Sequence, residues 1–306
     1  MMPIRPGTDI RDHTDIRHAD IVALNFMRPN DKIFFRRHYR HGLRSHIMEV
    51  LDARERRLES EGVLKDGLLF FPRARPRKML RLFRRRFDSA NQAMAEIHRL
   101  QILDHYLTPA FYAPSDEFIV DYQGPAGYTI MLCGLQEYIS GEDLDPWHHN
   151  PENQLPDISR RLTSEPYRAK QMPRPKLLPH IRQQVAGFIE RVKRMVKEAH
   201  HIPDLAGIGN ILVTAAAQVK LVDINNVSRL WFDHRIRVDD KGYPVCDKSV
   251  EALSLLEKHL TPRIDIKHDT VYRMFLDPQR MREVRRLELS FNRAFTREAQ
   301  SGAEPP

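Results

Sequence analysis

The chain has 306 residues, of which 41% are hydrophobic, and it carries a formal net charge of +8. This length suits one large domain or two lobes with a sizeable buried core. The absence of any apolar run of about 18 residues excludes a membrane-spanning helix, and the charged N-terminus predicts no secretory signal. The positive charge favours anionic partners such as nucleotide, phospholipid, lipopolysaccharide or nucleic acid, without choosing among them.

The two cysteines, Cys133 and Cys246, lie in segments predicted to be folded and lack metal-ligand spacing. We therefore predict buried free thiols and a reducing, cytoplasmic setting. The histidine pairs at 148–149 and 200–201 are poor chelates, because neighbouring helical residues point about 100° apart. The chain also lacks hydrolase-elbow, zincin and P-loop patterns.

Residues 1–64 are predicted to form a basic N-terminal arm followed by a helix. Residues 21–24 fit one helical turn or a short strand. From His41 to Leu58 the apolar residues recur mostly on one helical face, which predicts a helix that ends near Gly62.

Residues 65–140 are predicted to form a small antiparallel sheet with one helix. Residues 67–72 and 78–83 are predicted to pair as a hairpin, and residues 117–122 and 128–135 as a second one around a Gly-Pro turn. The helix is expected between them, from about Ser89 to Tyr106.

A strongly basic run overlaps the first predicted hairpin. Between Arg73 and Arg86 there are eight Lys or Arg residues and no acidic residue. The run is either a solvated basic face or an anion-binding surface. In the second interpretation it would contact a lipid headgroup at a membrane surface, a phosphorylated substrate or nucleic acid.

Residues 141–300 are predicted to be mainly helical. Residues 145–180 are rich in proline and indicate a linker. Helices are expected at about 180–200, 249–259 and 277–297, and the tail 301–306 is expected to be disordered.

The stretch from Ile202 to Val227 carries the chemistry. It predicts a loop with Asp204 and Asn210, followed by a β-hairpin whose second strand ends on Asp223. Carboxylate and amide oxygens on a rigid hairpin are suitable ligands for a metal ion bound to phosphates. Each residue also has a structural interpretation: Asp204 and Asn210 as turn residues, and Asp223 as a cap at the end of a strand.

This order of elements resembles the protein-kinase-like fold, including its aminoglycoside-phosphotransferase and lipopolysaccharide-kinase branches. Residues 202–204 stand where that family has His-Arg-Asp, Asn210 where it has the metal-binding Asn, and residues 223–225 where it has Asp-Phe-Gly. The resemblance covers residues 65–260. It implies an α+β, bilobal fold with a small antiparallel-sheet N-lobe (65–140) and a mainly helical C-lobe (141–300).

The resemblance implies a phosphotransferase that uses ATP and Mg²⁺ and acts on a protein hydroxyl or a small or lipid-linked hydroxyl. Asp204 would be the catalytic residue, and Asn210 and Asp223 would bind the metal. Arg81 would contact the phosphates and pair with Glu96. The alternatives are a surface charge for Arg81 and an ordinary helix residue for Glu96. Residues 136–139, with Glu137 and Tyr138, would form the hinge that binds adenine. Asp247 would support the catalytic loop.

Some positions depart from the family's pattern. The loop from Asp204 to Asn210 is one residue longer than usual, Ile202 replaces the His, and no Gly-rich phosphate loop precedes the basic run. These departures favour an alternative, a pseudokinase that holds nucleotide as a scaffold or regulator. A nucleic-acid-binding protein is a weaker third hypothesis, because the basic run lacks interleaved aromatic residues.

Overall fold

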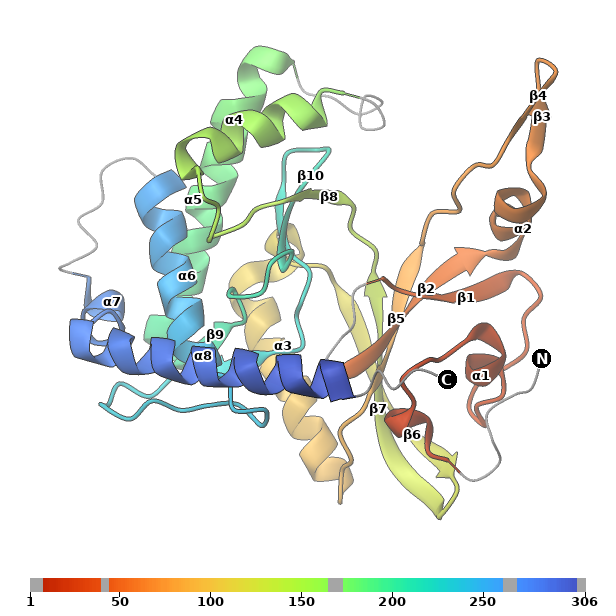
Figure 1. Cartoon of the computed structure of the whole chain (residues 1–306), viewed down its shortest axis with the longest axis horizontal. Helices are drawn as coiled ribbons and strands as arrows, with labels where there is room; N and C mark the ends of the chain where they lie inside the picture. The colour runs from red at the N-terminus through yellow and green to blue at the C-terminus, as the bar shows by residue number, and fades with distance from the viewer. Residues whose placement is uncertain (1–7, 40–43, 165–172, 261–268, 302–306) are drawn as a thin grey trace. The chain divides into compact units, whose positions relative to one another are not determined.

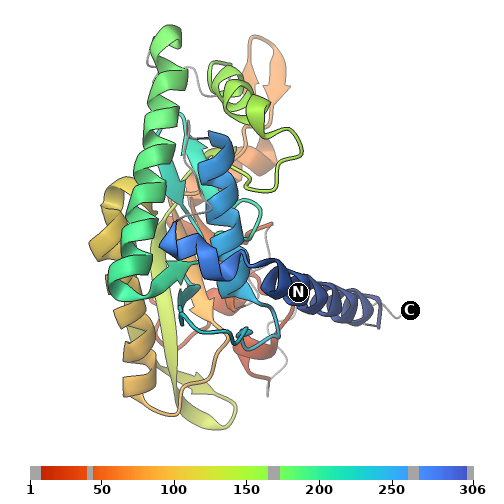
Figure 2. The ribbon, with the colours of Figure 1, turned by 90° about the vertical axis from the view of Figure 1, so that its left-hand side faces the viewer.

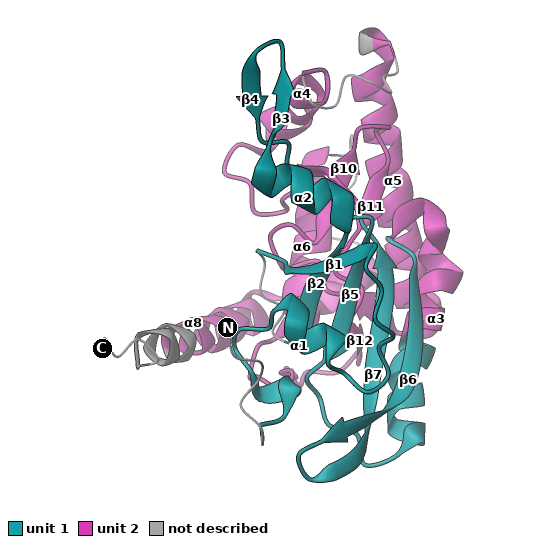
Figure 3. Cartoon of the chain, turned by 90° about the vertical axis from the view of Figure 1, so that its right-hand side faces the viewer, with its two compact units in different colours: residues 1–99, 113–138 teal, residues 100–112, 139–306 magenta. Residues whose placement is uncertain are grey.

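The computed structural model describes residues 8–39, 44–164, 173–260 and 269–301 (Figure 1). The predicted disordered tail, from residue 302 onward, and the start of the predicted helix at residues 41–43 lie outside the described residues. The chain divides into two compact units, which are described separately (Figure 3). Unit 1 contains residues 1–99 and 113–138, and unit 2 contains residues 100–112 and 139–306. An antiparallel sheet together with several helices confirms the predicted α+β class.

A five-stranded antiparallel sheet forms the centre of unit 1, in the order β1-β2-β5-β7-β6. The predicted strand 78–83 and the predicted hairpin around residues 123–127 are both confirmed. The strands of this sheet are β1 (Ile33–Arg37), β2 (Ser45–Asp52), β5 (Lys78–Phe83), β6 (Ser115–Gly124) and β7 (Gly127–Glu137).

The helix predicted from His41 to Leu58 is wrong over β2, which lies between β1 and β5. Side chains from both faces of this strand are buried, among them Met48 and Glu49. A strand covered on both faces loses the alternation of apolar and polar residues by which a strand is recognised. Only the second half of the prediction is helical, as α2 (Ala53–Glu61), with Asp52 as its N-cap.

The predicted pairing of residues 67–72 with residues 78–83 is also wrong. The segment instead forms β4 (Leu68–Phe70), which pairs with β3 (Val63–Lys65) in a separate two-stranded ribbon. Its turn, Asp66-Gly67, has positive φ at both residues (51° and 78°). An Asp-Gly pair with these angles is the favoured two-residue hairpin turn. The turn thus explains the pairing that the structure shows.

Two layers of apolar side chains cover the sheet of unit 1. The N-terminal segment, expected as an arm, covers one face with a 3-10 helix (η1, Ile10–Asp12) and α1 (His18–Val22). The first half of α3 (Ala90–Phe111) covers the other face through Ala93 and Ile97. Four apolar residues of this segment, Ile10, Ile16, Ile21 and Leu24, therefore belong to the core of unit 1.

Helices enclose the core of unit 2, where α5 and α6 pack side by side (Figure 2). The long helix expected from about residue 180 begins earlier, and the helices expected at 249–259 and 277–297 are confirmed. The helices are α4 (Pro151–Leu162), α5 (Arg174–Ala199), α6 (Val245–Leu260), α7 (Thr270–Phe275) and α8 (Pro278–Ser301).

The linker prediction is wrong over α4. Pro151 occupies the first turn of this helix, where a missing N–H costs nothing and the fixed φ angle is suitable. One face of α4 is buried through Leu155, Ile158 and Leu162. The same proline that indicates a linker is therefore part of a helix start.

Short strands complete unit 2 and carry the residues singled out by the sequence. The predicted hairpin after Asn210 is confirmed, and β8, from residues expected to end the first sheet, joins it in the order β11-β10-β8. A second pair joins β12 to β9. These strands are β8 (Gly141–Asp143), β9 (His201–Pro203), β10 (Ile211–Thr214), β11 (Val219–Leu221) and β12 (Val227–Arg229).

Both cysteines are free, as predicted; Cys133 is buried and Cys246 is half-buried. Burial raises the pKa of Cys133 to about 12 and that of Cys246 to about 11, so neither is a thiolate near neutral pH. Among the described residues, no helix combines the length and the apolar composition that crossing a bilayer requires.

Candidate functional site

Backbone hydrogen bonds connect the loop from Asp204 to Asn210 to the segment that follows β11. The Asp204 amide donates to the Asn226 carbonyl (2.8 Å), and the Val222 amide donates to the Asn210 carbonyl (2.8 Å). Asp223 directly follows Val222 and β11. Unit 2 thus brings together Asp204, Asn210 and Asp223, the three residues that the sequence singled out.

The Asn210 side chain is held in one orientation by the loop. Its Nδ2 donates to the Asp204 carbonyl (3.0 Å), so its Oδ1 is the atom that can accept a donor or bind a cation. A Cβ atom on Gly207 would lie only 2.6 Å from Asn210 Nδ2. Gly207 is therefore the residue that allows the loop to pass so close to this amide.

The Asp204 carboxylate accepts two hydrogen bonds inside the site. Its Oδ1 accepts from the Ala206 amide (2.9 Å), and its Oδ2 accepts from Asn226 Nδ2 (3.1 Å). Burial, and then the negative charge of Asp223, raise the pKa of Asp204 to about 6, while the hydrogen bonds oppose the rise. A pKa near the working pH suits a group that accepts and releases a proton.

Asp223 is half-buried, and its Oδ1 accepts from the Asn225 amide (3.3 Å). Its charge acts on Asp204, as the raised pKa of Asp204 shows. To a metal ion, Asp223 would offer a carboxylate oxygen and Asn210 its amide oxygen Oδ1. This is a fitting partial set for Mg²⁺, which completes its shell with phosphate oxygens and water.

The loop from Asp204 to Asn210 is supported by α6 and by a tryptophan. The Leu205 amide donates to Ser249 Oγ (3.2 Å), and Trp147 Nε1 donates to the Ala206 carbonyl (2.9 Å). The support expected from Asp247 comes instead from Ser249, two residues later. Asp247 forms a buried ion pair with Arg280.

The expected ion pair between Arg81 and Glu96 is replaced by other ion pairs of each residue in unit 1. Glu96 pairs with Arg85 and Arg99, on the exposed side of α3. Arg81 pairs with Glu117 of β6, and its Nη2 also donates to Ser115 Oγ (2.9 Å). The partner of Arg81 was not predicted because Glu117 lies 36 residues further along the chain.

Gly134 makes the Arg81–Glu117 pair possible. Gly134 on β7 lies in register between Arg81 of β5 and Glu117 of β6. A Cβ atom there would lie 2.5 Å from a Glu117 carboxylate oxygen. The side chains of Arg81 and Glu117 are only 2% and 3% exposed. Burial raises the pKa of Glu117, while the charge of Arg81 opposes this.

The expected hinge residues lie at the end of β7. The Glu137 amide donates to the Pro114 carbonyl (2.8 Å), so this N–H is engaged within unit 1. Tyr138 is half-buried, and burial followed by the nearby Glu49 raises the pKa of its hydroxyl. A contact of either residue with adenine stays a prediction.

Much of the basic run 73–86 is engaged within unit 1. Arg77 pairs with Asp52, and Arg86 pairs with Asp12. Arg85 has its partner on α3, and Arg81 is in the interior. The run is therefore not one continuous cationic face.

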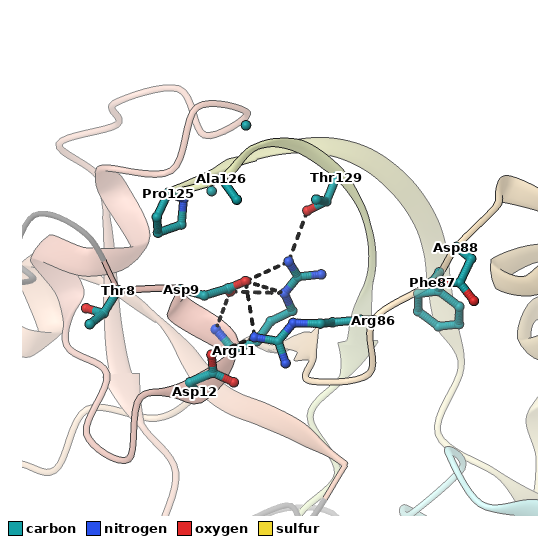
Figure 4. Close-up of a pocket in the computed structure, with 12 residues that line it drawn as sticks. Thr8, Asp9, Arg11, Asp12, Arg86, Phe87, Asp88, Pro125, Ala126 and Thr129 are labelled. Atoms are coloured by element: carbon teal, nitrogen blue, oxygen red, sulfur yellow. Dashed lines mark hydrogen bonds and ion pairs between the residues drawn. The ribbon is translucent and has the colours of Figure 1, made fainter.

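A cavity of about 550 Å³ lies beside this run, between the N-terminal segment and the β6–β7 turn (Figure 4). Arg11 and Arg86 converge there on Asp9, and Arg11 Nη2 also donates to Thr129 Oγ1 (3.0 Å). Burial opposes ionisation, but the hydrogen bonds and charge of Arg11 hold the pKa of Asp9 below its usual value. The cluster ties the N-terminal segment to the sheet.

Within the described part of the chain, no group of three or more His, Cys, Asp and Glu side chains is arranged to hold a metal ion. The ligand pair of Asn210 and Asp223 contains only one carboxylate, so phosphate oxygens would have to supply further ligands.

No protein-family model matches this chain, and no curated protein does.

Three residues that support the Asp204 loop or Arg81 were not predicted from the sequence. Asn226 binds the Asp204 carboxylate, Ser249 binds the loop, and Glu117 neutralises Arg81. Asn226 follows Asp223 by three residues, which is a signal that could have been used. Ser249 and Glu117 act across long sequence separations and leave no local pattern.

Replacing Asn226 with alanine is expected to raise the pKa of Asp204 above its value of about 6. The amide stabilises the ionised carboxylate, so losing it favours the protonated form. The loss of this hydrogen bond to a charged group should also lower the free energy of unfolding by about 1.5–3 kcal/mol. Carbon-13 NMR titration of the aspartate carboxyls measures the pKa. An unchanged Asp204 titration would contradict the assigned contact.

Proposed function

We propose that this protein is a phosphotransferase of the protein-kinase-like superfamily, which moves the terminal phosphoryl group of ATP to a hydroxyl acceptor with Mg²⁺. The observation that carries the proposal is the arrangement of Asp204, Asn210 and Asp223 on one loop and one hairpin. The Asn210–Asp204 hydrogen bond fixes the first two residues, and the charge of Asp223 acts on the Asp204 carboxylate. The order of these residues along the chain matches the family's catalytic loop and metal-binding hairpin.

Each residue has a distinct role in this proposal. Asn210 Oδ1 and the Asp223 carboxylate bind the metal, which neutralises charge on the phosphates when it is bound. Asp204 accepts a hydrogen bond from the acceptor hydroxyl and takes up its proton as the phosphoryl group is transferred. Asn226 and the Ala206 amide hold the Asp204 carboxylate in place. Glu137 and Tyr138, the expected hinge residues, are proposed contacts for nucleotide in unit 1, whereas the phosphate contact expected of Arg81 is not proposed, because its side chain is buried against Glu117.

A pseudokinase is the second candidate, and one observation favours it. Both carboxylate oxygens of Asp204 already accept hydrogen bonds from within the protein. A carboxylate held in this way can be a structural element of the loop. Nucleotide would then bind with its metal at Asn210 and Asp223, without transfer.

Nucleotide binding separates these candidates from unrelated functions. Wild-type protein is expected to bind a fluorescent ATP analogue in the presence of Mg²⁺. Asp223→Ala should weaken this binding at least tenfold, because it removes the only carboxylate of the ligand pair. Asp143→Ala is a matched control, since it removes an aspartate from the same small sheet, on β8.

Incubation with labelled ATP and Mg²⁺ then distinguishes the two candidates. Transfer to an acceptor, or slow hydrolysis, supports the enzyme, and binding alone supports the pseudokinase. Equal binding by wild-type protein and Asp223→Ala would overturn the metal site in both.

A further inference from the structure

The two-stranded ribbon β3–β4 exposes its apolar side chains. Exposed fractions reach 72% for Leu64, 64% for Leu68 and 61% for Phe71, which follows β4. Leu69 and Phe70 are about half exposed. An isolated two-stranded ribbon is marginal in water, and a run of exposed large apolar side chains indicates an interaction surface.

The strand register divides these side chains between two faces. Leu64 and Leu69 are directly opposite each other, so their side chains share one face of the ribbon. Val63, Lys65, Leu68 and Phe70 share the other face. Apolar side chains therefore lie on both sides of the same thin ribbon, although only one face carries a charge.

The residues that flank the ribbon are basic. Residues 53–77 contain seven Lys or Arg and four Asp or Glu. Two of those acids are already paired with arginines, Glu59 with Arg36 and Glu55 with Arg77. Lys65, Arg73 and Arg75 are exposed, and no ion pair involves them within the described parts of the chain.

We propose that the β3–β4 ribbon is a docking element for an anionic lipid bilayer surface. Leu64, Leu69 and Phe71 enter the boundary between headgroups and acyl chains, and Arg73 and Arg75 contact the anionic headgroups. Lys65 and Asp66, at the turn, stay at the level of the headgroups, so the ribbon lies along the membrane surface. The combination of buried apolar area and basic charge is what holds peripheral proteins on such surfaces.

A bilayer fits this surface better than a protein partner does. The exposed arginines next to the apolar residues complement anionic headgroups. The membrane contact expected from residues 73–86 is thus assigned to residues 63–75, because Arg77, Arg81, Arg85 and Arg86 have partners within unit 1.

Sedimentation with lipid vesicles tests this proposal. The full chain should bind vesicles of phosphatidylcholine with 30% phosphatidylglycerol at least tenfold more tightly than vesicles of phosphatidylcholine alone. Leu64→Ser/Leu69→Ser should weaken binding to the anionic vesicles at least tenfold. Arg73→Glu/Arg75→Glu should do the same. Leu289→Ser, at an exposed leucine of α8, and Arg160→Glu/Arg286→Glu, at two exposed arginines of unit 2, should change binding less than threefold.

A second measurement reports insertion directly. Leu69→Trp should shift to shorter emission wavelength on anionic vesicles and be quenched by brominated acyl chains, above the signal of the native Trp147 and Trp231. Circular dichroism confirms that each variant is folded. Absence of vesicle binding by the wild-type chain, or equal binding by the ribbon variants, would overturn the proposal. A dimer in light scattering that Leu64→Ser/Leu69→Ser converts to a monomer would assign the ribbon to a second copy instead.

Discussion

Replacing Glu117 with alanine is expected to lower the free energy of unfolding by about 3–5 kcal/mol. The variant leaves the guanidinium of Arg81 buried in the sheet of unit 1 without its carboxylate. Ser115 Oγ remains as a neutral acceptor and cannot balance the charge. The free-energy penalty of leaving a charge buried without its partner is larger than the free energy that the intact ion pair contributes to stability.

Urea unfolding, followed by circular dichroism, measures this loss. Removing both charges in Arg81→Met/Glu117→Leu should restore most of the stability, because an apolar pair of similar volume often replaces a buried ion pair at little cost. Asp157→Ala breaks the exposed pair with Arg160 and should cost less than about 1 kcal/mol. A loss for Glu117→Ala as small as that of Asp157→Ala would show that the buried pair is not formed.

Under the proposed function, replacing Asp204 with asparagine is expected to lower the rate of phosphoryl transfer by about 10²–10⁴-fold while leaving nucleotide binding within threefold. Asparagine keeps the shape of the side chain and an acceptor for the Ala206 amide, but it cannot take up the hydroxyl proton. The proposed metal ligands, Asn210 and Asp223, are unchanged. Single-turnover transfer from labelled ATP measures the rate. Equal transfer by Asp204→Asn and the wild-type protein would exclude Asp204 as the base.

Asp204→Asn is expected to raise the stability of the protein at pH 7, although it lowers the rate of transfer. The pKa of Asp204 rises from an ordinary 3.8 to about 6 on folding, so between pH 4 and pH 6 the folded state keeps a proton that the unfolded state has released. Stability from this group is therefore present below pH 4 and is lost as the pH rises through about 6, by about 2–3 kcal/mol in total. Asp204→Asn should remove that dependence and be more stable than the wild-type protein at pH 7. Thermal unfolding at pH 4 and pH 7 compares the two proteins.

The parts of the fold that sequence reasoning predicted are those with strong local patterns. The Gly-Pro turn between β6 and β7 and the apolar runs on either side of residues 215–218 each specify a hairpin. The apolar stripe of α5 specifies a long helix. The proximity of Asp204, Asn210 and Asp223 follows from the same hairpin, so these candidate residues could be found before the structure.

What could not be predicted depends on distant contacts. Strand β2 has apolar residues at helical spacing, and only its neighbours β1 and β5 make it a strand. Glu117 reaches Arg81 across an intervening strand, at a position where Gly134 has no side chain. The Asp66-Gly67 turn, in contrast, was a local signal that the prediction could have used. Tertiary packing, and not local propensity, decided β2 and the Arg81–Glu117 pair.

Neither compact unit is a continuous piece of the chain, and this has a consequence for synthesis on the ribosome. The second half of α3 belongs to unit 2, yet it is made before the last two strands of unit 1 (Figure 3). Its apolar residues Leu103, Leu107 and Phe111 join a core that includes Phe188 of α5 and Leu253 of α6. Because the ribosome adds about 5–20 residues per second, these side chains remain without their packing partners for several seconds. A nascent chain stalled near residue 140 should therefore be a chaperone substrate. Because each unit consists of two separate segments, no single cut of the gene can express either unit alone.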